Sequence, residues 1–117
     1  SAASDVYKRQ DIDAFVGVNE NSGMAILSAA TSAGLNNLYI TTVDATAENM
    51  TAIRDEKVAI GVSQDPYKMG YTAVEQAIKW CQGEETEKFI EVPVEYMDKD
   101  NIQDFIDREK GYGVEVE

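Results

Sequence analysis

Three polar side chains in this 117-residue chain each follow a short run of apolar or β-branched residues: Asn19, Asp44 and Gln64. A carboxylate accepts two hydroxyl hydrogen bonds at once, and the amides of Asn and Gln both donate and accept. Together these groups suit a ligand built of vicinal hydroxyls, because each hydroxyl both gives and takes a hydrogen bond. Another interpretation stays open, since strand ends lead into loops, where Asn, Asp and Gln are common anyway.

The sequence offers little for catalysis or metal binding. It has no histidine, and its single cysteine, Cys81, allows neither an intrachain disulfide nor a zinc cluster. Glycine-rich phosphate loops and serine nucleophile elbows are absent from it. An alternative, a small α/β enzyme with Asp44 as its base, lacks a His, Lys or Ser near the proposed site as second partner. We therefore expect a protein that is not an enzyme, with no catalytic residue, metal or cofactor.

The charge balance narrows the class of partner. The chain carries 22 acidic and 10 basic residues, a formal net charge of -12. Such a surface repels phosphate backbones and anionic lipid headgroups, so we expect no nucleic acid partner. No apolar run approaches the ~20 residues that a transmembrane helix needs.

Strand and helix patterns alternate along the chain and position the three polar residues. Strands are predicted at 13–18, 38–43, 58–63 and 89–97, and helices at 20–33, 47–55, 67–82 and around 102–106. This order is typical of the α/β class with a doubly wound parallel sheet covered on both faces. Ligands of such sheets bind beyond the carboxyl ends of the strands, where Asn19, Asp44 and Gln64 are expected to converge. The tail from residue 110 is expected to be loose.

The first ten residues of the chain differ in pattern from the residues that follow. Residues 1–10, SAASDVYKRQ, carry no strand or helix pattern that leads into the next segment. The stretch DVYKRQ also resembles a translation of the adaptor used to prepare sequencing libraries. We expect residues 1–10 to be a non-native leader joined to a truncated reading frame.

Four stretches in order resemble the ribose- and galactose-binding family of periplasmic proteins, the type I periplasmic binding proteins. They are VGVNENSGMAILSAATSAG, TTVDATAEN, IGVSQDPYKMGYTAVEQAIKWCQGE and VPVEYMDKDNIQDF, and the similarity covers residues 11 to about 107. The chain departs from the family pattern at Ser22 and Gly23, where a Met-Ala pair is usual, and at Ala45, where Gly is common. These departures leave the identity of the sugar open.

The resemblance implies a sugar receptor that feeds an ABC transporter. In that family a monosaccharide is clamped between two α/β lobes, and residues matching Asn19, Asp44 and Gln64 hydrogen-bond its hydroxyls. The implied partners are a ribose- or galactose-like monosaccharide, an ABC transporter permease and, in a sensor role, a chemoreceptor. The implied location is the periplasm or the cell exterior, with the protein either free or lipid-anchored.

The family topology also divides the chain. Residues 11–64 and 91–117 would form the C-terminal ligand-binding lobe, and residues 65–90 a hinge and a helix of the N-terminal lobe, the rest of which is missing. The apolar face of that helix, with Val74, Ile78 and Cys81, should then be left partly exposed. An alternative is the effector-binding domain of a lac-repressor-type transcription regulator, which shares the fold. Those regulators usually carry a proline-rich stretch near the Gln64 position, where this chain reads VAIGVSQDP.

Overall fold

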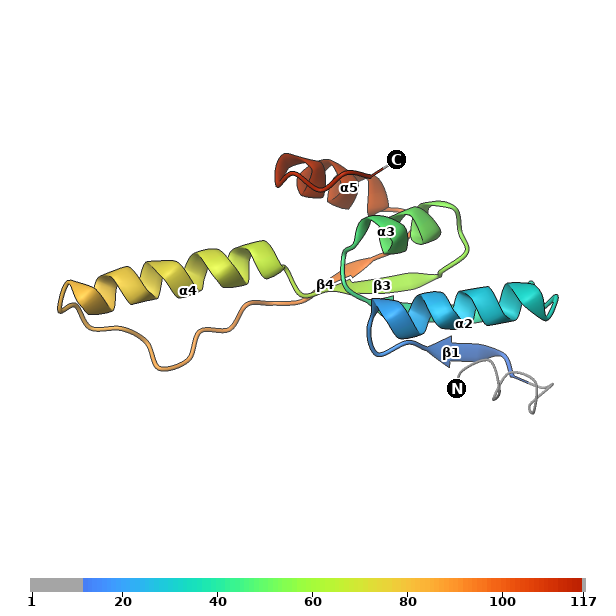
Figure 1. The fold of residues 1–117 in the computed structure, drawn as a ribbon, viewed down its shortest axis with the longest axis horizontal. Helices are drawn as coiled ribbons and strands as arrows, with labels where there is room; N and C mark the ends of the chain where they lie inside the picture. Colours follow the sequence, from blue (N-terminus) through green and yellow to red (C-terminus); the bar gives the residue numbers. More distant parts are fainter. Residues whose placement is uncertain (1–11, 117) are drawn as a thin grey trace.

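Strands and helices alternate along the whole described part of the chain, residues 12–116 of a computed structural model (Figure 1). The strands are β1 (Ala14–Val16), β2 (Tyr39–Val43), β3 (Ile60–Ser63) and β4 (Glu95–Met97). The helices are α2 (Glu20–Ser32), α3 (Ala47–Arg54), α4 (Pro66–Cys81) and α5 (Ile102–Gly111). The predicted α/β order is confirmed, and the predicted leader, residues 1–10, lies outside the described residues.

The four strands form one sheet in the order β1-β2-β3-β4. The first three strands are parallel, as predicted, but β4 runs antiparallel to β3. The reason is the path of the chain, which leaves the sheet beyond β3, runs out along α4 and returns from the same side. The predicted strand 89–97 is therefore too long, because residues 89–94 run beside α4 and only Glu95–Met97 enter the sheet.

Helices cover only one face of the sheet within the described residues. On the covered face, Thr42 of β2 meets Gly23 of α2, and its register partner Gly61 meets Ile53 of α3. Successive right-handed crossovers in one direction place α2 and α3 on the same side of the sheet. On the other face Tyr39 and Tyr96 are exposed. Within residues 12–116 helix cover is thus observed on this one face, and the predicted α/β class holds.

A single apolar core lies between the covered face and the helices. It joins α2, α3 and α5 through the buried side chains of Ile26, Met50, Ile53, Phe105 and Ile106. The tail adds to this core, since Val116 is 7% exposed. The predicted loose tail is therefore wrong at Val116, because an apolar side chain within reach of the core gains by leaving water.

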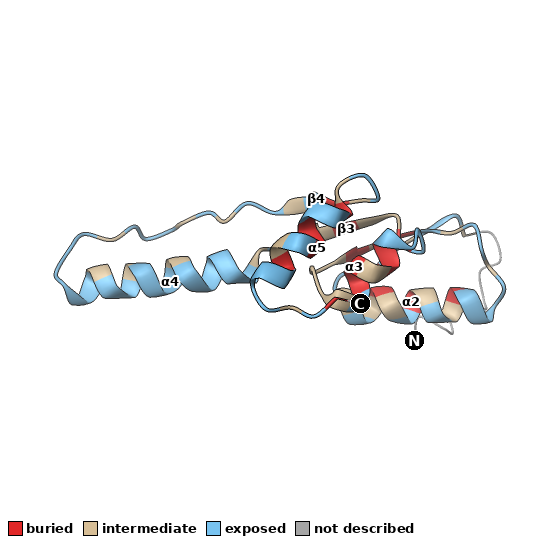
Figure 2. Cartoon of the chain, turned by 90° about the horizontal axis from the view of Figure 1, so that it is seen from above, coloured by how far each residue is buried: buried red, intermediate tan, exposed pale blue. Residues whose placement is uncertain are grey.

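The helix α4 and the following residues 82–94 project from this body as an arm (Figures 1 and 2). The molecule measures 59 × 27 × 19 Å with a radius of gyration of 17.7 Å, whereas a compact domain of this length has about 13 Å. No residue of α4 is buried, and Val74 and Ile78 are 61% and 52% exposed. The expected exposure of this apolar face is confirmed. None of the helices in residues 12–116 has both the length and the apolar character required to cross a membrane.

Close packing at Gly23 generates a first prediction. A Cβ at Gly23 would lie 2.7 Å from the Cβ of Thr42, which is on a strand and moves little. Gly23→Ala should therefore push α2 away from β2 and lower the free energy of unfolding by about 1–3 kcal/mol, as measured by urea denaturation. Gly70→Ala on α4 is the matched control, because a Cβ there meets no atom within 4 Å. Equal effects of the two substitutions would contradict close packing as the cause.

Candidate functional site

The carboxyl ends of β1, β2 and β3 form one rim of the sheet, and the three polar residues singled out in the sequence lie along it. Asp44 and Gln64 come directly after β2 and β3, and Asn19 comes three residues after β1. The hydroxyl of Thr42 lies 3.4 Å from the backbone oxygen of Asn19, which ties the end of β1 to β2. The expected common rim is observed.

Asp44 and Gln64 are joined directly. The side-chain amide of Gln64 donates to the Oδ1 atom of Asp44 at 2.8 Å. Gln64 is exposed and Asp44 is half-buried, so both side chains can still reach a ligand. The remaining carboxylate oxygen of Asp44 and the carbonyl oxygen of Gln64 are acceptors, and the second amide hydrogen of Gln64 is a donor.

The backbone of Asp44 is held in an uncommon conformation. Its φ is +82°, in the left-handed region, which carries a cost for a residue other than glycine and persists only where the surroundings impose it. The fully buried Asn49 donates its amide to the backbone oxygens of Val43 and Asp44 at 3.3 and 2.5 Å. The Asp44 N–H donates to Val62 at 2.8 Å. These bonds fix the backbone from which the Asp44 side chain projects, and Gln64 contacts the carboxylate itself.

Asn19 has a second task that its position alone did not reveal. It is the N-cap of α2, and its Oδ1 accepts from the Ser22 N–H at 2.9 Å. The Ser22 hydroxyl accepts from the Asn19 N–H at 3.2 Å, which completes a capping box. No hydrogen bond found in residues 12–116 joins the Asn19 side chain to Asp44 or Gln64. Of the three residues predicted to converge, Asp44 and Gln64 are therefore in direct contact, and Asn19 lies on the same rim without touching them. The amide NH2 of Asn19 remains available as a donor.

Sequence reasoning missed Glu20 and Met69 as neighbours of the site. The Thr46 hydroxyl, which caps α3, donates to Glu20 and so joins the starts of α2 and α3. Met69 lines a hollow of about 360 Å³ together with Asp44, Ala45, Thr46, Gln64 and Pro66. That volume is within the range of small-molecule sites, roughly 300–1,000 Å³. Glu20 could have been found in the sequence, because it is an acid that directly follows Asn19. Met69 could not, because only the position of α4 brings it beside the site.

Charged side chains gather where the arm joins the body. Arg108 of α5 donates to Glu95 of β4 at 2.6 Å, and its Nε lies 3.6 Å from the buried carboxylate of Glu109. Burial raises the pKa of Glu109, Arg108 opposes that rise, and Asp65 and Glu95 add to it by charge repulsion. The ionised form of Glu109 therefore lowers the free energy of unfolding of the protein.

Comparisons with known proteins place these features in context. The family described as "Periplasmic binding protein domain" matches residues 1–85. A putative rhizopine-binding protein of Rhizobium meliloti is 27% identical over 97 residues, which is 81% of this chain and 31% of the relative. The chain thus spans about a third of the length of this curated relative.

Solved structures show the same fold at low sequence identity. An ABC transporter periplasmic solute binding protein from Actinobacillus succinogenes, with bound D-allose, matches with a TM-score of 0.85 at 19% identity, over 88% of this chain and 36% of that one. A Caulobacter myo-inositol binding protein bound to myo-inositol matches with a TM-score of 0.81 at 20% identity, over the same 88% and 36%. The predicted α/β architecture of a type I periplasmic binding protein is therefore confirmed.

The raised pKa of Glu109 leads to a prediction on pH and stability. Because that pKa is raised in the folded state, the contribution of Glu109 to stability is present at low pH and is lost as pH rises through the folded-state value. Glu109→Gln should therefore raise the urea midpoint at pH 7, and the gain should vanish below the ordinary glutamate pKa of about 4.3. The exposed Glu115→Gln is the control and should show no such pH-dependent gain. An equal gain at both pH values would contradict burial as the cause.

Proposed function

The chain belongs to the periplasmic binding protein family, and from this premise we propose that it is the ligand-gripping part of a sugar receptor that serves an ABC transporter. The observation that carries the proposal is the Asp44–Gln64 pair, joined at 2.8 Å at the rim of the parallel strands. The pair lines a hollow of suitable size, and the backbone under Asp44 is fixed by Asn49.

The chemistry of the pair suits a neutral ring that carries adjacent hydroxyls. A hydroxyl that donates to Asp44 makes a charge-assisted hydrogen bond, the stronger kind, and its oxygen can still accept from Gln64 or Asn19. D-allose and myo-inositol, the ligands bound in the two similar structures, are rings of this type. The proposed ligand is therefore a monosaccharide or a closely related polyol, with ribose- and galactose-like sugars as first candidates.

The shape of the chain supports a division between two lobes. Residues 11–64 and 91–117 would form one lobe, while residues 65–90 would cross a hinge and belong to the other. The arm has exposed apolar side chains on α4 and on the returning segment, including Ile78 and Phe89. Such side chains are expected to pack against the remainder of a longer receptor, because contiguous exposed apolar surface marks an interaction site.

The periplasmic binding protein family implies a location outside the cytoplasm. The partners would be a sugar, the permease of an ABC transporter and, in a sensor role, a chemoreceptor. The receptor would be free in the periplasm or anchored by a lipid at the cell surface. The relatives named above favour a receptor over the effector-binding domain of a lac-repressor-type regulator, because they are solute-binding proteins.

Asp44→Asn in the full-length receptor tests the role of the carboxylate. Asn tolerates the left-handed backbone nearly as well as Asp, so the substitution removes charge without adding strain. We expect the sugar-induced rise in melting temperature, measured over pentoses, hexoses and polyols, to be lost. A ligand at 100 times its dissociation constant stabilises the unsubstituted receptor by about 2.7 kcal/mol.

The control for this experiment is Asp100→Asn, which removes one exposed carboxylate remote from the rim. This variant should keep the full thermal shift. A shift that survives Asp44→Asn unchanged would refute the assignment of Asp44 as a ligand-binding residue.

The 117-residue chain by itself should bind such sugars weakly or not at all. It presents one side of the proposed cleft, so a ring would stay half in water and lose the contacts of the other lobe. Titration calorimetry of the chain with D-ribose, D-galactose and myo-inositol should give no measurable heat of binding. A micromolar dissociation constant for any of the three would contradict the two-lobe proposal.

A further inference from the structure

The hollow beside the Asp44–Gln64 pair combines two kinds of lining. Asp44 and Gln64 supply a carboxylate and an amide that are joined at 2.8 Å. Three other lining residues, Ala45, Pro66 and Met69, present apolar side chains. None of these three side chains carries a hydrogen-bonding group apart from the weakly accepting sulfur of Met69. We refer to Ala45, Pro66 and Met69 as the apolar wall of the hollow.

The sixth lining residue, Thr46, carries a hydroxyl that is already engaged. This hydroxyl donates its single hydrogen to Glu20 and accepts from the Asn49 N–H at 3.3 Å. It therefore has no hydrogen left to donate to a ligand. Among the six lining side chains, the amide of Gln64 is thus the one donor open to a ligand.

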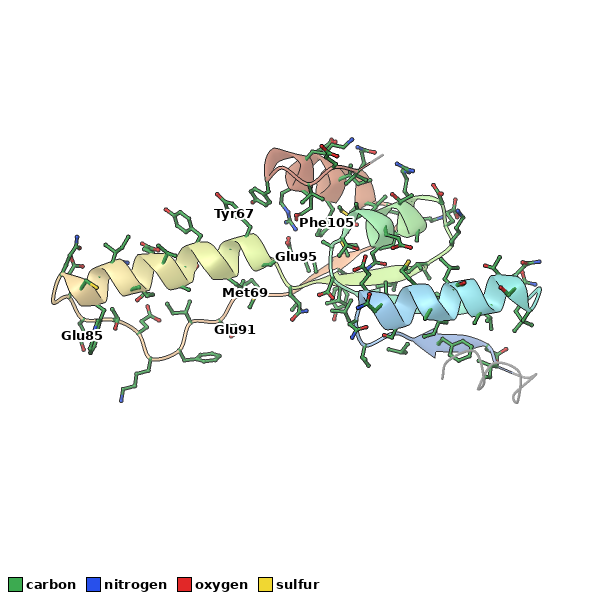
Figure 3. All side chains as sticks on the ribbon, viewed as in Figure 1. Tyr67, Met69, Glu85, Glu91, Glu95 and Phe105 are labelled. Atoms are coloured by element: carbon green, nitrogen blue, oxygen red, sulfur yellow. The ribbon has the colours of Figure 1, made fainter. Side chains whose placement is uncertain are left out.

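Met69 extends the apolar wall from α4. Its side chain belongs to a residue that is 49% exposed, and Figure 3 shows it on the side of α4 away from Tyr67. Pro66 and Met69 are three residues apart and are therefore neighbours on the surface of the helix. The methionine side chain is flexible and polarisable, so it adapts to an apolar group placed against it. The exposed part of Met69 is available for such a contact.

The two kinds of lining favour different groups on a ligand. A hydroxyl beside Asp44 and Gln64 both donates and accepts a hydrogen bond. A hydroxyl against the apolar wall would lose its bound water without gaining a partner, and this loss weakens binding. A methyl group in the same place would gain by leaving water. The hollow is therefore better suited to a ring with one apolar substituent than to a ring with hydroxyls on every side.

We propose that the apolar wall selects a ring that carries a methyl group, of which a 6-deoxyhexose is the simplest case. Asp44 and Gln64 bind adjacent ring hydroxyls, and the methyl group lies against Met69 and Pro66. The inference rests on the proposed function, because it assigns a substrate class to the same site. Burial of one methyl group favours the deoxy sugar by about fourfold. An apolar pocket rejects an added hydroxyl by about a hundredfold at most.

Matched pairs of sugars test this proposal in the full-length receptor. D-fucose is D-galactose without its 6-hydroxyl, and the same change relates 6-deoxy-D-glucose to D-glucose and 6-deoxy-D-allose to D-allose. Titration calorimetry should give the lower dissociation constant for the deoxy sugar of each pair that binds. The measured quantity is the ratio of the two dissociation constants within a pair. A general loss of affinity or stability changes both constants alike and leaves this ratio unchanged.

Two polar substitutions test whether the apolar wall causes the preference. Met69→Gln keeps nearly the same length and adds an amide that can bind the 6-hydroxyl, so the ratio should fall to about one or invert. Met69→Leu keeps the apolar character and should keep the ratio. Ala45→Ser adds a hydroxyl to the same wall and should also lower the ratio, which keeps the test valid should Met69→Gln lose its fold by circular dichroism.

Lys68→Gln is the matched control, because Lys68 is exposed beside Met69 on α4 and does not line the hollow. Its ratio should equal that of the unsubstituted receptor. A deoxy preference that persists in both Met69→Gln and Ala45→Ser would overturn the apolar wall as its cause.

The same titrations separate this inference from the proposed function. Parent hexoses that bind as tightly as their deoxy partners, or more tightly, would overturn the methyl preference and leave the sugar-receptor proposal standing. Binding of none of the six hexoses would overturn the preference as well. The thermal shift with pentoses and polyols, described above, then decides whether the proposed function survives.

Discussion

The candidate site depends on one buried amide. Asn49 lies in the first turn of α3 and donates to two successive backbone oxygens at the end of β2. Without these bonds the chain at Asp44 would relax out of the left-handed region, since nothing in an aspartate favours that conformation strongly. The backbone position from which Asp44 reaches Gln64 therefore depends on a residue that does not itself line the hollow.

A second constraint is the direction in which the chain leaves the sheet. The backbone of Asp65 is in the left-handed region, and its Oδ1 caps α4 by accepting from the Lys68 N–H at 2.9 Å. Pro66 occupies the first turn of α4, where its missing N–H costs nothing. The helix then runs away from the body for 16 residues. The chain must return over the same distance, and this return explains why β4 joins the sheet in the reverse direction.

Much of this arrangement could be predicted from the sequence because local patterns determine it. Short apolar runs identified the strands, and helix caps such as Thr46 and Asp65 use local hydrogen bonds. The positions of Asp44 and Gln64 followed from the parallel order of the strands. The capping of α2 by Asn19 was missed, because the same side chain suits a cap and a ligand equally. The Arg108–Glu95 pair was missed because no pattern in a sequence links residues that only the return of the chain brings together.

The open face of the sheet has a consequence for how this chain behaves in water. Tyr39, Tyr96 and Val16 present apolar surface that the helices of the described part leave bare. Two copies that met through these faces would hide it, yet each copy carries a net charge of -12, and like charges keep molecules apart over a Debye length. Electrostatic repulsion between copies therefore opposes burial of this apolar face. Added salt screens the repulsion and should favour self-association.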